Sequence, residues 1–240
     1  MSKNFDDLLS KLKVAEKKKL AVAVAQDEPV LEAVKAAKDR GIADAILVGD
    51  RAKIEEVAAQ IDMDLTDFEI IHEEDVKIAA LKAIQLVSSG AADMVMKGLV
   101  DTATFLRSVL NKEVGLRTGK LMSHVSVFEI EGIDRLILLT DAAFNTYPDL
   151  KQKVQIINNS VMVAKACGIE NPKVAPVCAV EVVNPDMPAT VDAALLSKMS
   201  DRGQIKGCIV DGPLALDNAL SEEAAPVSYT HLTLPTICSV

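Results

Sequence analysis

The chain has 240 residues, and its 26 Lys and Arg against 35 Asp and Glu give a formal net charge of −9. Half of the residues are hydrophobic, yet Phe, Tyr and Trp together make up only 3%. The apolar fraction excludes a disordered chain, and the acidic balance with few aromatic residues argues against a nucleic-acid-binding protein. A chain of this length forms one large domain or two small ones.

The cysteines and the apolar runs indicate the compartment. No two of the four cysteines form a C-x-x-C pair, and no apolar run approaches the ~20 residues that cross a bilayer. Residues 1–19 carry charges throughout, unlike a signal peptide. We therefore expect reduced thiols and a soluble cytoplasmic protein.

Short apolar runs alternate with longer amphipathic segments from the start of the chain. The run at 20–25 fits a strand buried on both faces, and Asp27 then begins a helix that ends at Gly41. Further strands are predicted at 45–50, 68–72 and 92–98, and further helices at 51–61, 75–90 and 102–111. This alternation predicts parallel strands joined by right-handed helical crossovers.

The pattern changes after Gly115. The runs 124–130 and 135–141 are separated only by EGID, which is too short for a helix, so they predict an antiparallel hairpin. Beyond it we predict helices at 149–166, at 189–201 and near Leu214, and strands at 173–180 and 206–212. The expected fold class is α/β, with mostly parallel sheets in two domains, 1–140 and 141–225, that share a cleft.

Residues 226–240 differ in composition from the rest of the chain. They contain no Asp, Glu, Lys or Arg, although a quarter of the whole chain is charged. One interpretation is a terminal strand and a short tail. The interpretation we favour is a non-native tail that includes VSYTHLTLPT and is translated from an adapter sequence joined to a truncated gene. On that interpretation, 226–240 stands outside the fold and the second domain is incomplete.

The common cofactor motifs are missing. There is no G-x-G-x-x-G and no G-x-S-x-G, and GLRTGKL at 115–121 departs from a phosphate loop in its glycine spacing and in its final residue. The three histidines are far apart and lack metal-ligand spacing. We therefore predict neither a bound cofactor nor a metal.

Polar residues gather where predicted parallel strands end, which is where open α/β sheets bind ligands. Lys97 with the hydroxyls at the next helix N-terminus suits an anion cradle, but Thr102 equally suits an ordinary cap. Arg117 offers a planar fork for phosphate, whereas His124 taken alone fits a satisfied core histidine, and Asp217 fits a helix cap. The candidate binding residues are Lys97, Gly98, Thr102, Thr104, Arg107, Arg117, Ser123, His124, Asp141, Asn145, Asp211, Gly212, Pro213 and Asp217.

Four long segments carry a family resemblance: KGLVDTATFLRSVLNKEVGLR, SHVSVFEI, TDAAFNTYPDLKQKVQIINNS and DGPLALDNALS. Together they resemble the phosphate acetyl/butyryltransferase family, most closely its butyryltransferase branch, over about residues 10–225. The resemblance implies two domains of the isocitrate/isopropylmalate dehydrogenase type, substrates in the cleft between them, and a homo-oligomer. It also implies reversible transfer of a butyryl or similar short acyl group from acyl-CoA to inorganic phosphate, with CoA as a substrate.

The resemblance further implies roles for the candidate residues. Those from Lys97 to His124 would form the phosphate and acyl site, and those from Asp141 to Asp217 would form the wall contributed by the second domain. The family's C-terminal segment, with a Ser-Arg pair and an acidic residue, has no counterpart here. The catalytic base is therefore not indicated, and we expect little or no activity. Two alternatives stay open: a phosphate acetyltransferase, and a non-catalytic module that holds a small anion.

Overall fold

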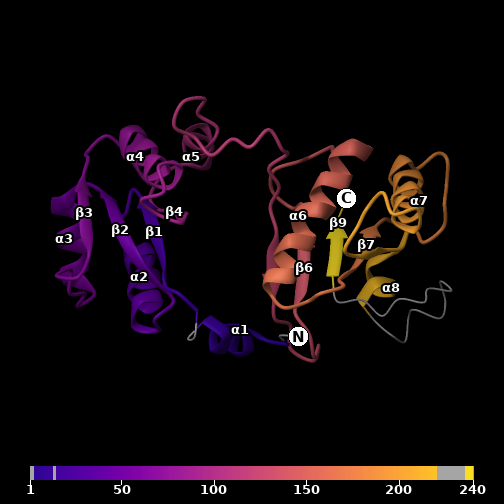
Figure 1. Cartoon of the computed structure of the whole chain (residues 1–240), viewed down its shortest axis with the longest axis horizontal. Coiled ribbons are helices and arrows are strands. Elements are labelled where there is room, and N and C mark those ends of the chain that lie inside the picture. The colour runs from indigo at the N-terminus through magenta and orange to yellow at the C-terminus, as the bar shows by residue number, and fades with distance from the viewer. Residues whose placement is uncertain (1–2, 13–14, 221–235, 240) are drawn as a thin grey trace. The chain divides into compact units, whose positions relative to one another are not determined.

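The computed structural model describes residues 3–12, 15–220 and 236–239, and the chain forms two compact units (Figure 1). Unit 1 contains residues 1–8 and 120–240, and unit 2 contains residues 9–119. The sequence suggested a boundary near residue 140, but the units divide between Gly119 and Lys120. The division comes earlier because the hairpin that ends at residue 140 belongs to the sheet of unit 1.

Unit 2 is built on a parallel sheet in the order β3-β2-β1-β4. Its strands are β1 (Lys18–Ala23), β2 (Ala43–Gly49), β3 (Glu69–His72) and β4 (Met94–Lys97). The parallel alternation predicted from the sequence is therefore confirmed for this unit. Because β2 and β4 lie on opposite sides of β1, the strand order switches between β1 and β4, a position that favours ligand binding in such sheets.

Helices cover both faces of this sheet. They are α2 (Glu28–Asp39), α3 (Arg51–Gln60), α4 (Val76–Ser88) and α5 (Thr102–Val109). Successive residues of β1 point to opposite faces. Val22 packs in the core with α2 and α3, whereas Ala21 and Ala23 pack in the core with α4. The strand predicted at 20–25 is thus buried on both faces, as its unbroken apolar run indicated.

The sheet of unit 1 has the order β5-β6-β9-β7-β8. Its strands are β5 (Ser126–Phe128), β6 (Ile137–Thr140), β7 (Lys173–Val177), β8 (Ile209–Val210) and β9 (Thr236–Ser239). The β5–β6 pair is antiparallel, which confirms the predicted hairpin, and the other pairs are parallel. Helices α6 (Leu150–Ala166) and α7 (Pro188–Asp201) pack on one face, and α8 (Leu216–Leu220) packs on the other.

Strand β9 lies in the segment that was expected to stand outside the fold. Its backbone joins β6 to β7, and Ile237 is in register with both Leu139 and Ala175. The structure differs from the expectation at 236–239 because this stretch has β-branched residues suited to a strand and fits between two parallel neighbours. Residues 226–235 and 240 of the same tail lie outside the described residues.

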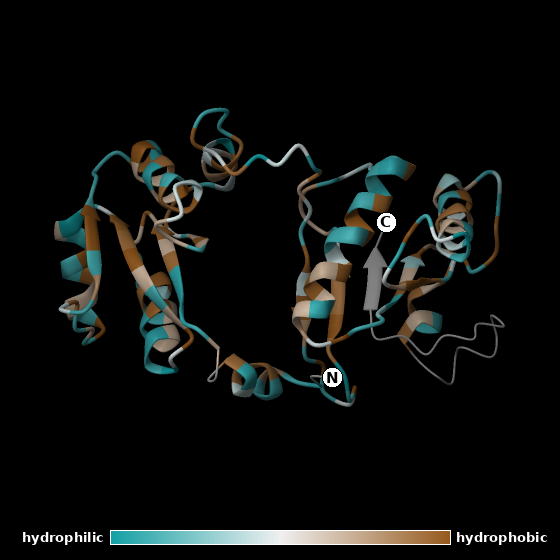
Figure 2. Cartoon of the chain, in the orientation of Figure 1, coloured by the Kyte–Doolittle hydropathy of each residue, from teal (hydrophilic) through white to brown (hydrophobic). Residues whose placement is uncertain are grey.

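The helices are amphipathic. Figure 2 shows hydrophobic residues along β2 and a mixture of hydrophobic and hydrophilic residues around α3 and α7. The N-terminal helix α1 (Phe5–Leu12) has no buried residue. Within the described part of the chain, no helix has the length and apolar character needed to cross a membrane.

Candidate functional site

Four of the predicted residues meet at the carboxyl edge of the sheet in unit 1. Asp141 follows the last residue of β6, and Asn145 lies four residues further on. Because β5 is antiparallel to β6, the segment that enters β5 arrives at the same edge and brings Ser123 and His124 there. Asp141 binds the amide of His124 and the side chain of Asn145, and Asn145 binds the carbonyl oxygen of Met122, while Ser123, between Met122 and His124, is bound by Asn159.

Asp141 is the centre of this cluster. Its Oδ1 accepts from the amides of Ala143 (2.9 Å) and Phe144 (3.0 Å), and its Oδ2 accepts from the amide of His124 (3.2 Å) and from Asn145 Nδ2 (2.6 Å). An ionised carboxylate offers about four acceptor positions. Partial burial acts to raise the pKa of Asp141, but the four hydrogen bonds outweigh it and hold that pKa below its usual value. Asp141 therefore stays ionised and orders the loop.

His124 is held by its backbone and leaves one ring nitrogen unused. Thr140 Oγ1 donates to its carbonyl oxygen (2.6 Å), and its ring meets Phe144 edge-on, with 5.8 Å between ring centroids. Its Nδ1 is buried and has no hydrogen-bond partner among the described residues. His124 is therefore not a satisfied core histidine, since a buried polar atom without a partner is unfavourable. This nitrogen is thus a buried polar atom of the cluster that no described residue satisfies.

Ser123 is positioned by a residue that the sequence did not indicate. Asn159, in the middle of α6, donates from Nδ2 to Ser123 Oγ (2.8 Å) and to the carbonyl oxygen of Leu121 (3.0 Å). Asn145 Nδ2 likewise donates to the carbonyl oxygen of Met122 (3.0 Å). No spacing pattern connects Asn159 to residues 121–123, because the contact depends on how α6 packs beside the loop.

The predicted residues after β8 lie at the same edge but apart from this cluster. Asp211, Gly212 and Pro213 follow Val210, and Asp217 lies in the first turn of α8. Two strands, β9 and β7, separate β8 from β6, so three spacings of about 4.8 Å, roughly 14 Å, lie between the ends of β8 and β6. The structure therefore brings Asp211 to the edge without bringing it to Asp141.

In unit 2, Lys97 and Gly98 lie at the switch between β1 and β4. Lys97 ends β4 and is exposed, whereas Gly98 is buried and its amide donates to the carbonyl oxygen of Ala23 (2.8 Å). A Cβ at position 98 would lie 2.2 Å from the carbonyl oxygen of Val24. The close approach of the two backbones therefore requires glycine here.

A buried acceptor beside this switch was also missed. Gln26 follows β1, and its Oε1 is buried without a hydrogen-bond partner among the described residues. A Cβ on Gly49, at the end of β2, would lie 2.1 Å from that oxygen. Gln26 belongs to no motif, so only the packing against Gly49 shows that its amide is enclosed.

The residues predicted as an anion cradle are arranged differently from the expectation. Asp101 caps α5 and accepts from the amide of Thr104 (2.8 Å), so the alternative in which Thr102 caps this helix is wrong. Thr104 is buried, and hydrogen bonds from it lower the pKa of Asp101. Thr102 and Arg107 are exposed. The backbone N–H of Thr104, which was expected to help bind an anion, is thus already bonded to the carboxylate of Asp101.

Arg117 is exposed in the segment after α5. Its neighbour Gly115 packs against the end of that helix, because a Cβ there would lie 2.3 Å from the carbonyl oxygen of Asn111 and 2.6 Å from that of Val109. Gly115 therefore lets its backbone pack closely against the end of α5. Gly119 has a φ of +75° and open space around it.

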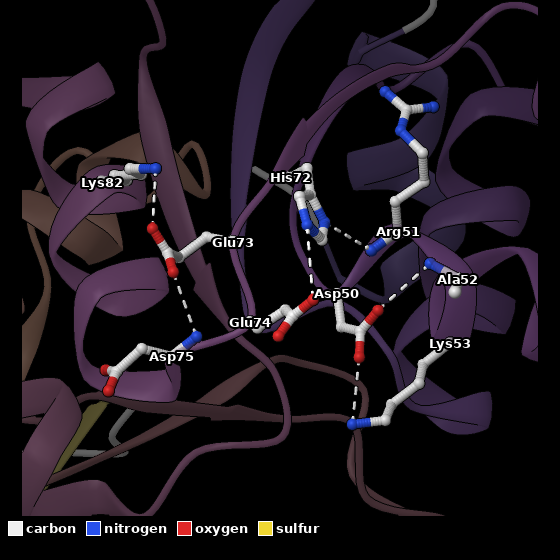
Figure 3. Close-up of polar contacts among 9 residues, drawn as sticks. All are labelled: Asp50, Arg51, Ala52, Lys53, His72, Glu73, Glu74, Asp75 and Lys82. Atoms are coloured by element: carbon white, nitrogen blue, oxygen red, sulfur yellow. Dashed lines mark hydrogen bonds and ion pairs between the residues drawn. The ribbon is translucent and has the colours of Figure 1, made fainter.

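The carboxyl ends of β2 and β3 carry a polar network that the sequence did not single out (Figure 3). Asp50 accepts from the amide of Ala52 (3.2 Å), and His72 Nδ1 accepts from the amide of Arg51 (3.2 Å). Glu73 binds Lys82 Nζ (2.8 Å). These contacts cap helices and hold loops, which is a structural role. The described residues contain no group of three or more His, Cys, Asp or Glu arranged to hold a metal ion.

Comparison with known proteins identifies the family. The family model described as phosphate acetyl/butaryl transferase matches residues 4–80 and 72–235. The chain is 73% identical over 225 residues to a phosphate butyryltransferase of Clostridium acetobutylicum, covering 94% of this chain and 75% of that protein. It is 46% identical over 208 residues to a phosphate acetyltransferase of Thermotoga maritima, covering 87% of this chain and 70% of that protein.

The structural comparison agrees. A branched-chain phosphotransacylase from Enterococcus faecalis superposes with a TM-score of 0.78 at 28% identity, covering 92% of this chain and 79% of that one. The α/β fold with mostly parallel sheets is thus shared with a phosphotransacylase. Because the family model covers most of the sequence and the Clostridium protein is similar along most of its length, this chain belongs to the phosphate acetyl/butaryl transferase family of phosphate acyltransferases.

Proposed function

We propose that this protein reversibly transfers a butyryl or similar short acyl group from acyl-CoA to inorganic phosphate, giving acyl phosphate and CoA. The observation that carries the proposal is the 73% identity to a phosphate butyryltransferase over 225 residues. In the reaction, an oxygen of phosphate attacks the thioester carbonyl carbon and a new C–O bond forms. The C–S bond then breaks, and the CoA sulfur leaves as a thiolate that takes up a proton.

This chemistry needs cationic and N–H donors, because phosphate must be held close to the carbonyl while negative charge builds on its oxygen. In unit 2, we assign phosphate binding to Lys97, Arg107 and Arg117, which are exposed and positively charged. In unit 1, we assign substrate contact to His124, whose Nδ1 is buried without a partner among the described residues. Asp141 serves as a positioning residue, since its four acceptor positions are already used.

The proposal is tested by CoA release from butyryl-CoA, measured with and without phosphate. Release that requires phosphate supports it, and His124→Ala should lower kcat/KM by about 100-fold, within the range for a lost transition-state contact. An exposed control, Tyr147→Phe, should leave kcat/KM unchanged. Hydrolysis of butyryl-CoA at the same rate without phosphate would contradict the proposal.

Two alternative functions differ from the proposed one in the acyl-CoA that they prefer or in whether they bind CoA. A phosphate acetyltransferase is favoured by the 46% identity to the Thermotoga protein, and it should prefer acetyl-CoA. A non-catalytic module for a small anion should ignore CoA altogether. Titration with CoA therefore distinguishes a transferase of either kind from such a module.

Further expectations about the whole enzyme belong to the same proposal. The mostly parallel sheets of the two units support an isocitrate/isopropylmalate dehydrogenase-like architecture, and we propose a homo-oligomer, which light scattering would measure. The thiols of Cys178 and Cys208 are not in disulfides, which supports the reducing cytoplasm. The alignment with the Clostridium protein covers 75% of that protein.

A further inference from the structure

A basic pocket lies on the exposed face of α6 in unit 1. Its volume is about 420 Å³, within the ~300–1,000 Å³ typical of small-molecule sites. The residues that line it are Lys120, Gln155, Asn158, Asn159, Val161, Met162, Lys165 and Lys206. This set contains three lysines and no carboxylate, in a chain whose net charge is −9.

Lys120 is placed at the pocket by the amide side chains of α6. The backbone amide of the next residue, Leu121, donates to Gln155 Oε1 (3.0 Å), and its carbonyl oxygen accepts from Asn159 Nδ2 (3.0 Å). Gln155 and Asn159 are four residues apart and so lie on one face of the helix. The side chains of Gln155 and Asn159 therefore bind both polar groups of the Leu121 backbone, and this fixes the position of the neighbouring Lys120.

The other two lysines come from different segments. Lys165 lies in the last turn of α6, and Lys206 lies in the turn that leads to β8. A Cβ on Gly207 would lie 2.7 Å from Lys165 Nζ, so the glycine leaves the space that this ammonium group occupies. The negative end of the helix dipole accounts for Lys165 but not for Lys120 or Lys206. Three segments thus each contribute a lysine to the lining of the pocket.

Lys165 and Lys206 bring two ammonium groups to the lining of this pocket, and no carboxylate lines it. Ammonium groups are good donors to phosphate oxygens, and the amide of Asn158 adds a further polar group. Val161 and Met162 give the pocket an apolar part, and Met162 is 61% exposed. The pocket therefore suits a ligand that combines phosphate groups with a less polar body, rather than a bare phosphate ion.

We propose that this pocket binds the phosphate groups at the nucleotide end of CoA, an inference that rests on the proposed function. Asn159 lines the pocket and also donates to Ser123 Oγ (2.8 Å), so the pocket borders the Ser123–His124 segment. A second pocket of unit 1, about 600 Å³, has three carboxylates and one lysine in its lining, so its charge is wrong for such a ligand. Charge thus selects the α6 pocket.

The test is calorimetric titration of the full chain with CoA and, separately, with inorganic phosphate, at low and high salt. The double variant K165Q/K206Q should raise the Kd for CoA at least tenfold and flatten its salt dependence. The charge-preserving K165R/K206R should retain binding. K151Q, an exposed lysine of α6 outside the pocket, should bind CoA like the unmodified chain. Circular dichroism of every variant checks folding.

The outcomes separate this inference from the proposed function. Unchanged CoA affinity in K165Q/K206Q would overturn the pocket assignment, whereas phosphate-dependent acyl transfer by the same protein would leave the function standing. If the double variant loses inorganic phosphate binding but keeps CoA binding, the pocket holds free phosphate and the assignment is wrong. CoA binding that depends on the two lysines, without any acyl transfer, would support the pocket and contradict the function. Absence of CoA binding would contradict both.

Discussion

Asp141 is the residue on which the order of the Ser123–His124 segment depends most directly. It accepts four hydrogen bonds, of which one comes from the amide of His124 and one from Asn145. In Asp141→Asn, an NH2 group replaces one acceptor and faces an N–H donor. We expect the free energy of unfolding to fall by about 1–3 kcal/mol, measured by urea denaturation. Asp186→Asn, an exposed control in the same unit, should change it by less than about 0.5 kcal/mol.

The same carboxylate predicts a pH dependence. The pKa of Asp141 is lower in the folded protein than in the unfolded chain, because its hydrogen bonds outweigh the effect of burial. Its stabilising contribution is therefore fully present above the unfolded value of about 3.9 and is lost as the pH falls through the lower folded value. Unfolding curves from pH 6 down to pH 3 should show a steeper loss of stability for the unmodified chain than for Asp141→Asn. Parallel losses would contradict this prediction.

At the scale of single residues, the sequence predicted the cluster in part. Asp141 and Asn145 were identified because they follow a strand, and His124 because it precedes one. Asn159 was missed, since its contact with Ser123 arises from the packing of α6 and not from any spacing. Polar residues at strand ends can be predicted from local pattern, whereas partners that arrive from another element depend on tertiary structure.

Two aspartates at helix N-termini, one with side-chain cap bonds and one without, allow a test of how much capping stabilises a helix. Asp75 caps α4 and accepts from the amides of Lys77 (2.8 Å) and Ile78 (3.0 Å), whereas Asp27 precedes α2 without a side-chain cap bond. Asp75→Ala should therefore lower the free energy of unfolding by about 1 kcal/mol. Asp27→Ala should lower it by less than about 0.5 kcal/mol, as for an ordinary surface change. Equal effects in urea denaturation would show that the side-chain bond of Asp75 adds nothing.

Strand β9 is the element whose removal should matter most. It lies between β6 and β7 and pairs with both, so a chain ending at residue 225 would leave two strands without their shared neighbour. Each lost backbone hydrogen bond is worth about 1 kcal/mol, so several kcal/mol of stability should disappear. Ile237→Pro, which removes one N–H from β9, should act in the same direction. If 1–225 and 1–240 unfold at the same urea concentration, residues 226–240 stand outside the fold.

Most elements were predictable because their apolar periodicity is strong. The run at 20–25 indicated a strand with two buried faces, and β1 has the core on both sides. The cap of α5 was not predicted, because Asp101 and Thr102 are both good caps and only the backbone geometry separates them. The composition of residues 226–240 predicts a segment outside the fold, but composition carries no information about which strands lack a neighbour in the sheet.

At the scale of the molecule, overall charge and local charge oppose each other. A net charge of −9 repels phosphate and the phosphate groups of CoA at long range. Binding of either substrate must therefore depend on local cations, a role that our proposals give to Lys97 and to the lysines of the α6 pocket. Salt weakens both effects, but exposed charges separated by more than about 10 Å are screened more than close contacts. Moderate salt should thus weaken the long-range repulsion between the acidic chain and the substrate phosphates before it weakens close contacts between lysines and those phosphates.

The choice of acyl group also belongs to the whole molecule, because no single spacing encodes the volume of an acyl pocket. Long alignments favour butyryl, with 73% identity to a phosphate butyryltransferase against 46% to a phosphate acetyltransferase. Acetyl-CoA lacks two methylenes of butyryl-CoA, and each methylene in an apolar pocket is worth about 1–3 kcal/mol of discrimination. We therefore expect kcat/KM for acetyl-CoA to be about 30-fold or more below that for butyryl-CoA, with propionyl-CoA between them. Equal or faster use of acetyl-CoA, measured as phosphate-dependent CoA release, would instead make this chain a phosphate acetyltransferase.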